Sequence, residues 1–396
     1  MATAILDLHI ENLPAEVKGL GAYRKALALL RYKGKPVGRI TIPVSDGIIR
    51  TSDYYPSILE ISGRQLSQAW LNDYLQWNEM PVPIQELTAT IAICTRNRTQ
   101  DLERCLNALM KLPNDGQEFL VIDNCPSDER TFELVISYER VRYVREMNPG
   151  LDFARNRALR EAKHEIVVFT DDDAMPDPGW LRAMMKNFGN PLTACVTGLT
   201  MPLELETEAQ EAFEHYNSFV KGFQRKVHSH FTRNPLSTGE VGAGANMAIR
   251  RSITDKIGFF DEALDAGTIT QSGGDHEYFT RILINGFEIV YEPAALSWHR
   301  HRRTWKETRQ AIEGYGVGVY AYWTRCLLVE REFGILKFPV NWLVHTQLPN
   351  LIRSVLRRPS AQPLSLIIAE FSGCLKGPWA YIRSRRRLKK RQNTVR

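Results

Sequence analysis

Three consecutive aspartates, Asp171 to Asp173, directly follow an apolar run in the segment EIVVFTDDDAMPDPGW (165–180). Carboxylates packed side by side repel one another, so a folded chain seldom keeps them without a cationic partner. If the chain is still extended there, side chains alternate, so Asp171 and Asp173 face one way and Asp172 the other. Two converging carboxylates form half a site for Mg²⁺ or Mn²⁺, with diphosphate oxygens of a substrate as further ligands. An acidic turn without a ligand is the alternative.

A further aspartate, Asp275, follows two glycines in SGGDHEYFTRIL (272–283). Ser272 and Asp275 have the spacing of a capping box, and carboxylates are favoured at helix N-termini, so a plain helix cap is one interpretation. The other is a general base that a glycine-permitted turn presents to a site. Because the aspartate triplet occurs in the same chain, we favour the base.

Other polar residues follow apolar runs that read as strands. Asp123 comes after FLVI and suits a bidentate contact to a nucleobase edge or to ribose hydroxyls, although such a residue is as often a turn cap. Arginines near the same edge suit phosphate or base contacts, although each alone fits an ordinary surface position: Arg96, Arg98, Arg155 and Arg157.

Two later segments are less specific. VGAGANMAIRR (241–251) contains Gly244 and Asn246, and its glycines either let the backbone approach a ligand or form a tight buried turn. In LSWHRHRRTW (296–305), His299 and His301 stand two apart, so on an extended segment they share a face that suits a metal or phosphates. A purely structural role for both histidines is the alternative.

The elements that must position these residues alternate from residue 88 onwards. TATIAICT, EFLVIDN, VRYVRE and EIVVFTDDD read as strands, and between them lie helical patterns, the first with Leu102, Cys105, Leu106 and Leu109 on one face. Such alternation predicts a mostly parallel sheet covered on both faces, in which ligands bind beyond the carboxyl ends of the strands. No G-x-G-x-x-G follows the first strand and no phosphate-loop motif occurs, which disfavours dinucleotide oxidoreductases and phosphate-loop ATPases.

The ends of the chain differ from this middle part. Residues 1–85 predict a small α+β domain of unknown role, with two strands joined by a turn at 33–36 and a helix after them, and 79–87 predicts a linker. Residues 306–396 predict a helical, basic region, because 19 Lys and Arg stand against 5 Asp and Glu after residue 300, compared with 32 against 40 before it. Its aromatic, apolar and basic composition fits helices lying on an anionic membrane surface, or else packing on the catalytic part.

Composition predicts an ordinary globular chain of 396 residues, 43% hydrophobic, with a net charge of +6. Its six cysteines show no metal-type spacing and predict free thiols in a reducing compartment. Asp7 and Glu11 interrupt the start where a signal peptide would be apolar, and no run of 18 apolar residues occurs. We therefore expect a cytoplasmic protein, either free or peripheral on the inner face of the cell membrane.

In order, seven segments resemble the glycosyltransferase family 2 pattern on the GT-A fold, over about 88–305: TIAICTRNRTQDLERCLNAL, VIDNCPSDERT, NPGLDFARNRAL, FTDDDAMPDPGWL, GAGANMAIRRS, GGDHEYFTRIL and WHRHRR. The resemblance implies an inverting transfer of sugar from a nucleoside diphosphate sugar to an acceptor hydroxyl, with Mg²⁺ or Mn²⁺. It implies Asp275 as the catalytic base and Asp171, Asp173 and His299 as metal ligands. The implied substrate-binding residues are Thr95, Arg96, Asp123, Arg155, Asp171, Asp172, Gly244 and Asn246.

The chain departs from the family at one position. The family often has Glu-Asp where this chain has Gly274 before Asp275, so the base is retained and one carboxylate is missing. Glu277, one turn later, is a partial substitute.

We predict a transferase of cell-surface polysaccharide or glycolipid synthesis, with a sugar or lipid-linked acceptor. We favour a UDP-sugar as donor, although no residue decides between UDP, GDP and dTDP. A nucleotidyltransferase would need a G-x-G-T-R-type loop that TRNRTQD lacks, and a nucleic-acid-binding protein would need basic residues before 300. An inactive scaffold, for which Gly274 is the sole support, is the remaining alternative.

Overall fold

A nine-stranded sheet forms the centre of the computed structural model, which describes residues 2–75, 88–358 and 361–395. The predicted linker at 79–87 lies outside the described residues. Strands run in the order β10-β14-β11-β13-β9-β6-β7-β8, with β12 pairing β14. Their bounds are β6 (Ala89–Thr95), β7 (Glu118–Asn124), β8 (Val141–Glu146), β9 (Ile166–Asp171), β10 (Ala174–Pro176), β11 (Thr193–Pro202), β12 (Lys226–His228), β13 (Asn246–Arg250) and β14 (Glu288–His299).

Most strands of this sheet point in one direction. β6, β7, β8 and β9 pair in parallel, and β11 and β14 share their direction because β13 lies antiparallel between β9 and β11. β10, β12 and β13 run the opposite way. The sheet is therefore mostly parallel, as the alternating pattern predicts.

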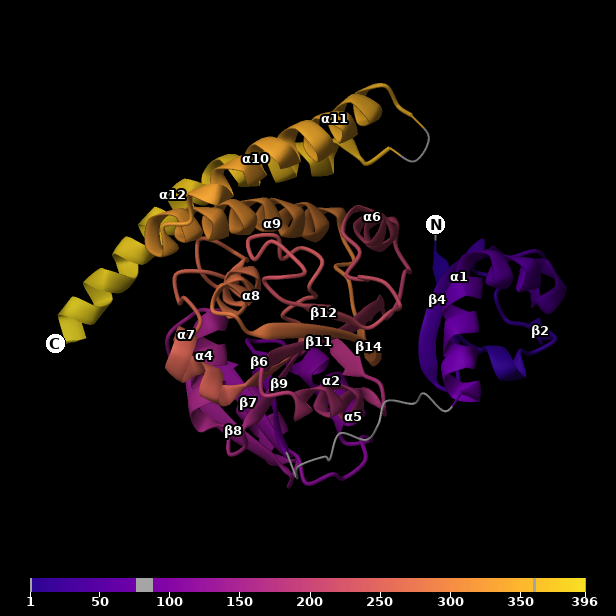
Figure 1. Cartoon of the computed structure of the whole chain (residues 1–396), viewed down its shortest axis with the longest axis horizontal. Coiled ribbons are helices and arrows are strands. Elements are labelled where there is room, and N and C mark those ends of the chain that lie inside the picture. The colour runs from indigo at the N-terminus through magenta and orange to yellow at the C-terminus, as the bar shows by residue number, and fades with distance from the viewer. Residues whose placement is uncertain (1, 76–87, 359–360, 396) are drawn as a thin grey trace.

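Helices cover both faces of the sheet, since its strands are apolar on both sides (Figure 1). Ile91 and Ile93 pack in a cluster with α2 (Thr99–Leu109) and α5 (Trp180–Met185), while Ala92 belongs to a cluster on the other face with α4 (Leu151–Glu161) and α8 (Gly274–Ile284). The predicted helical face of α2 is confirmed, because its four apolar residues are fully buried. Shorter helices are α3 (Arg130–Ile136), α6 (Glu208–Tyr216) and α7 (Thr254–Ile257).

The N-terminal residues form a separate three-stranded sheet, β1 (Thr3–His9), β3 (Lys25–Tyr32) and β4 (Lys35–Pro43), covered by α1 (Thr51–Tyr74). A small pair, β2 (Glu16–Val17) and β5 (Ile49–Arg50), lies beside it. β3 is apolar on both faces: Leu30 packs toward α1, whereas Leu27 and Leu29 pack against Leu199 and Leu296 of the central sheet. The second face explains the run ALALL, which a solvent-facing strand would not need.

Arg31 joins this N-terminal sheet to the central body. Its guanidinium donates to Asp7 at 2.8 Å and to Asp177 at 2.7 Å, and only 8% of its side chain is exposed. Arg31→Ala removes the cation that pairs with the Asp177 carboxylate. We therefore expect the free energy of unfolding to fall by about 1–3 kcal/mol and the midpoint of thermal unfolding to be lower. The exposed Arg24→Ala is the control, and equal midpoints for both variants would contradict this role.

Helices fill the C-terminal part. α9 (Trp305–Arg325) and α12 (Leu364–Val395) lie side by side over the central body, and α10 (Lys337–Trp342) and α11 (Leu348–Val355) lie on them (Figure 1). One-turn π-helices, η4 (Cys326–Glu330) and η6 (Leu343–Gln347), follow α9 and α10. Over the described residues, every helix is too short or too polar to cross a membrane. Within the predicted basic region, the stretch RSRRRLKKR (383–391) lies on α12.

Candidate active site

The carboxyl ends of three parallel strands bring the predicted polar residues together. In the register of the sheet, Cys94 of β6 stands beside Asp171 of β9, and Thr95 stands beside Asp123 of β7. Side chains that are 28 to 77 positions apart in the chain are therefore neighbours at one edge. This placement follows from parallel pairing and agrees with the expected binding edge.

Within the aspartate triplet, the side chains divide as alternation predicts. One carboxylate oxygen each of Asp171 and Asp173 lies with a His299 ring nitrogen in a group whose atoms are all within 4.8 Å of one another. Asp172 instead accepts hydrogen bonds from Thr95 Oγ1 at 2.7 Å and from Arg98 at 2.6 Å. Asp172 thus holds the loop after β6 against the end of β9.

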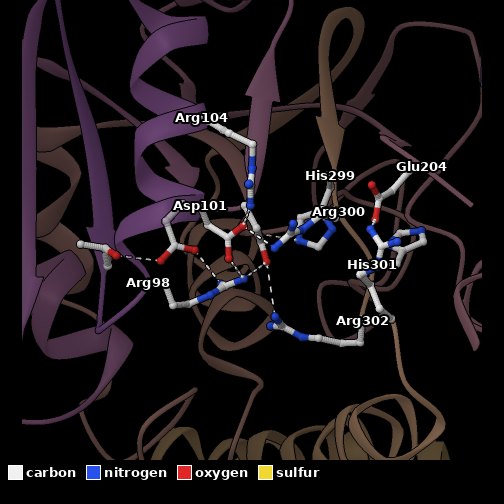
Figure 2. A network of polar contacts seen from close by, with 12 residues as sticks. Arg98, Asp101, Arg104, Glu204, His299, Arg300, His301 and Arg302 are labelled. Carbon is white, nitrogen blue, oxygen red and sulfur yellow. Dashed lines mark hydrogen bonds and ion pairs between the residues drawn. The ribbon is translucent and has the colours of Figure 1, made fainter. Parts of the chain in front are cut away.

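Three basic side chains from distant segments surround Asp173. Arg98 Nη2 donates to its Oδ2 at 2.7 Å, His299 Nε2 lies 3.1 Å from its Oδ1, and Arg302 Nη1 lies 3.5 Å from its Oδ2. Figure 2 shows Arg98, His299 and Arg302 converging on one cluster of carboxylates. Burial alone would raise the pKa of Asp173, but His299, Arg98 and Arg302 hold it well below its usual range. Asp173 is therefore ionised.

The Asp171–Asp173–His299 group fits a divalent cation. Two carboxylates and an imidazole are ligands that suit Mn²⁺ and related ions, and the burial of Asp173 leaves few waters to compete. Burial and the neighbouring Asp173 raise the pKa of Asp171, so Asp171, unlike Asp173, lacks sufficient positive charge from its protein neighbours. His299 Nδ1 is buried without a hydrogen-bond partner among the described residues.

Asp275 lies in the first turn of α8, and the predicted capping box is wrong. Gly273, in a left-handed conformation at φ 100°, occupies the N-cap, and Ser272 Oγ instead donates to the Gly314 carbonyl of α9 at 3.0 Å. Close packing against α9 imposes this turn, because a β-carbon at Gly273 would lie 2.6 Å from the Gly318 carbonyl oxygen. The turn leaves the Asp275 carboxylate free to face the sheet edge.

Backbone donors and positive charge keep Asp275 ionised. Its Oδ2 accepts from the Gly244 N–H and its Oδ1 from the His276 N–H, both at 2.8 Å. Burial raises the pKa of Asp275, but His276, Arg155 and these two N–H groups more than offset it, so the net shift is downward. Gly244 is suited to this contact, since a β-carbon there would lie 2.9 Å from Asp275 Cβ.

Asp152 of α4 fills the space that a side chain at Gly274 would need. A β-carbon at position 274 would overlap the Asp152 carboxylate, which is completely buried. Asp152 pairs with Arg155 at 3.0 Å, and Arg155 pairs with Asp265 at 2.7 Å. The carboxylate missing at 274 thus has a counterpart from another helix.

Gly274→Ala should therefore be costly. The new methyl group must displace the buried Asp152 carboxylate from its ion pair with Arg155, and we expect about 1–3 kcal/mol of destabilisation, measured by urea unfolding. Gly179→Ala is the matched control, because the nearest atom to a β-carbon there is 3.6 Å away. A Gly274→Ala chain as stable as this control would show that Asp152 can move aside at little cost.

A cavity of about 630 Å³ joins the two acidic sites. Asp171, His299, Arg155, Gly244 and Asp275 all line it. Further lining residues of note are Lys221, His276, His301, Arg302 and Tyr315. The predicted base and two of the predicted metal ligands, Asp171 and His299, therefore face one space, whereas Asp173 is not among the lining residues.

Other predicted residues take different places. Asp123 is buried at the strand edge, where Tyr143 donates to its Oδ2 at 2.8 Å, while its Oδ1 has no hydrogen-bond partner among the described residues. Arg96 is exposed on the loop after β6. Asn246 is completely buried. Its side-chain oxygen accepts a hydrogen bond from Trp180 of α5, and its side-chain nitrogen donates to the Leu199 carbonyl of β11. It therefore links β13 to these elements and does not line the cavity.

Two more predicted residues are paired with other side chains of the protein. His301 lines the cavity, but its Nε2 lies 3.0 Å from Glu214 Oε2. Glu277, the expected substitute for a missing carboxylate, is buried in ion pairs with Arg281 and Arg325. The carboxylate that lies next to position 274 is instead that of Asp152.

Sequence reasoning missed four residues of this site: Asp152, Asp265, His276 and Arg302. Asp152 stands three positions before Arg155 in the expected helix, a spacing that places both on one face and that could have indicated the pair. Asp265 and Arg302 reach the site only through tertiary folding, so no local pattern reveals them.

Comparison with known proteins agrees with this geometry. The model of the family described as Glycosyl transferase family 2 matches residues 90–258. A pre-mycofactocin glycosyltransferase of Mycobacterium tuberculosis is 27% identical over 231 residues, covering 57% of this chain and 46% of that protein. A poly-beta-1,6-N-acetyl-D-glucosamine synthase of Staphylococcus epidermidis is 24% identical over 255 residues, covering 61% and 58% respectively. The chain spans about half the length of these curated relatives.

The fold has a counterpart among solved structures. A mannosyltransferase of Pyrobaculum calidifontis, solved with GDP-Man and Mn²⁺, superposes with a TM-score of 0.53 at 17% identity and covers 79% of this chain and 94% of its own. This likeness, with the strand order above, confirms the expected GT-A fold. The segment 90–258 carries the aspartate triplet and the carboxyl ends of β6, β7 and β9. Over that segment, the chain is similar to glycosyl transferase family 2.

Proposed function

We propose that this chain is an inverting glycosyltransferase that moves a sugar from a nucleoside diphosphate sugar to an acceptor hydroxyl. The observation that carries the proposal is the single cavity lined by Asp171, His299, Arg155 and Asp275. The cavity thus brings two members of the candidate metal-ligand group, Asp171 and His299, together with the ionised carboxylate of Asp275, and a metal site and a base are the two functions that such a transfer needs. The match of residues 90–258 to the model of glycosyl transferase family 2 supports the same reaction.

Asp171, Asp173 and His299 would hold the divalent cation, which when bound supplies positive charge that stabilises the diphosphate leaving group. Asp123, with its unpartnered oxygen, and Thr95 lie where the nucleoside would bind, as family resemblance implies. Arg155 faces the cavity and is held by Asp152 and Asp265, so its charge is fixed in place.

Asp275 accepts the proton of the acceptor hydroxyl. As that oxygen attacks the anomeric carbon, its acidity rises, so a carboxylate whose pKa is below the usual range is still an adequate acceptor. The backbone N–H groups of Gly244 and His276 fix the orientation of the carboxylate before substrate arrives.

A donor panel tests this reaction. The full chain is incubated with UDP-, GDP- and dTDP-sugars, with and without Mn²⁺, and release of nucleoside diphosphate and the anomeric configuration of the released sugar are followed by NMR. We expect one donor base to be preferred, with UDP favoured, and inverted configuration. No release from any donor would contradict the proposal, and pyrophosphate release from a nucleoside triphosphate and a sugar phosphate would indicate a nucleotidyltransferase instead.

We further propose that the transferase works at an anionic membrane surface, on a lipid-linked acceptor of polysaccharide or glycolipid synthesis. From the residue before α10 through η6 and α11, a stripe of exposed apolar residues recurs at helical spacing: Leu336, Val340, Val344, Leu348, Ile352 and Val355. From 333 to 369 the chain has four basic residues and no acidic one. Apolar contact and positive charge together favour binding to vesicles that contain phosphatidylglycerol.

Cosedimentation with such vesicles tests the membrane proposal. We expect binding to phosphatidylglycerol vesicles, weaker binding to phosphatidylcholine, and loss of binding in Val344→Asp with Ile352→Asp. Equal sedimentation of wild type and this variant would contradict it.

A further inference from the structure

A second cavity, of about 460 Å³, opens beside the active-site cavity. It lies between the C-terminal part of α9, the α10–η6 segment and the loop at 236–239. Its aromatic lining residues are Tyr322, Trp323, Phe338 and Trp342, and its polar ones include Thr238, His276, Asn341, His345 and Thr346. Neither the metal group nor the predicted nucleoside residues lie in it.

The two cavities share a wall. Gly239, His276 and Val319 line both of them. His276 follows Asp275 directly, and its backbone N–H donates to the Asp275 carboxylate at 2.8 Å. Its ring is fixed by a contact of 3.0 Å between Nδ1 and Thr238 Oγ1. The second cavity therefore borders the residue that directly follows the proposed base, Asp275.

The aromatic rings of this cavity are held rigidly. Tyr322 bonds the Leu236 carbonyl at 2.9 Å and Thr280 at 2.8 Å. Trp323 and Trp342 meet edge to face, with centroids 5.7 Å apart, and Phe338 packs on Trp323 at 6.2 Å. Fixed rings offer flat apolar surface at little entropic cost.

The polar side chains at the rim of the second cavity are available for hydrogen bonds to a ligand. Asn341, His345 and Thr346 are exposed, and within the described part of the chain their side chains make no hydrogen bond. Amide, imidazole and hydroxyl groups offer both donors and acceptors. A pyranose ring has an apolar C–H face and hydroxyls around its edge, so it matches a cavity that is aromatic on its walls and polar at its rim. An alkyl chain would form no hydrogen bonds with these polar groups, so it would use only the aromatic walls.

We propose that this second cavity is the acceptor subsite and that it binds a sugar ring of the acceptor, stacked on the Trp323–Trp342 pair and hydrogen-bonded by Asn341 and His345. The inference rests on the proposed transferase function. It assigns to the helices after residue 305 a direct part in choosing the acceptor. The exposed stripe at Val340 and Val344 is separate, because neither residue lines the cavity.

Saturation-transfer NMR on the full chain tests the subsite without turnover. The probes are methyl glycosides of glucose, galactose, mannose and N-acetylglucosamine, with decanoate as an alkyl probe. We expect at least one glycoside to bind, and at least fivefold weaker binding in Trp342→Ala and in the double variant Asn341→Ala, His345→Ala. Trp379→Ala is the matched control, because Trp379 is 63% exposed on α12 and outside the cavity.

Binding of UDP, GDP and dTDP with Mn²⁺ is measured on the same samples and should be unchanged in all variants. Glycoside binding that persists in the double variant, no glycoside binding at all, or binding of decanoate alone would each overturn the subsite. The double variant changes only exposed side chains, so it decides the matter even if Trp342→Ala does not fold. Absence of nucleotide binding in the wild type would instead contradict the transferase function, while the glycoside result would still decide the cavity.

Discussion

Asp275→Asn should lower the rate of sugar transfer by about 10²- to 10⁴-fold, because the variant has no carboxylate to accept the proton of the attacking hydroxyl. The change is nearly isosteric, and the asparagine oxygen still accepts one of the two N–H groups, from Gly244 or His276. We therefore expect the protein to fold and the loss to appear in kcat. The measurement is release of nucleoside diphosphate from the donor that the panel selects.

Measuring nucleotide binding by Asp275→Asn distinguishes loss of the base from damage to the donor site. Asp275 belongs to α8, whereas the metal group is built from β9, the turn after it and β14, so affinity for nucleoside diphosphate with Mn²⁺ should stay within about twofold of wild type. Asp255→Asn, an exposed aspartate in the first turn of α7, is the matched control and should keep full activity. An Asp275→Asn enzyme with wild-type kcat would remove the base assignment.

Asp171→Asn should abolish the Mn²⁺-dependent thermal stabilisation that nucleoside diphosphates give to the wild type. A ligand at one hundred times its Kd stabilises the folded state by about 2.7 kcal/mol, which is a readily measured shift in the unfolding midpoint. Asp171 is the clean choice for this test, because the salt bridges of the triplet are made by Asp172 and Asp173. The substitution removes a proposed metal ligand and leaves those ion pairs intact.

The comparison with Asp173→Asn adds a second readout. That variant should lose the same ligand-dependent shift and also unfold at a lower temperature without ligand, because Arg98 and Arg302 lose a buried counter-charge. If Asp171→Asn keeps the full Mn²⁺-dependent shift, the cation is held elsewhere. Asp255→Asn again serves as the control.

Much of the site could be predicted because its parts follow strands of clear pattern. Asp171 comes after a buried strand, and parallel pairing brings it to the same edge as Thr95 and Asp123. Asp275 could be found for a similar reason, since two glycines before an apolar helix indicate an unusual helix start. Ser272 shows the limit of local spacing: the capping-box pattern was present, but contact with α9 placed its hydroxyl elsewhere.

The parts that could not be predicted depend on which elements meet. Nothing in the sequence near Asp265 indicates that it pairs with Arg155, which is 110 positions away. The same holds for the second apolar face of β3, whose partners Leu199 and Leu296 lie in the central sheet. Burial of such residues depends on packing between elements. A hydrophobic pattern with a period of two or 3.6 residues reports only the faces of a single strand or helix, so it does not predict this burial.

The contact of Gly273 with Gly318 gives α9 control over the alignment of Asp275. Backbone lies directly on backbone there, so no flexible side chain can absorb a displacement. A shift or tilt of α9 must therefore move the turn that carries the carboxylate. Since α10 and η6 follow α9 and bear both part of the exposed apolar stripe and one wall of the second cavity, whatever binds these helices can change the position of Asp275, the proposed base, through α9.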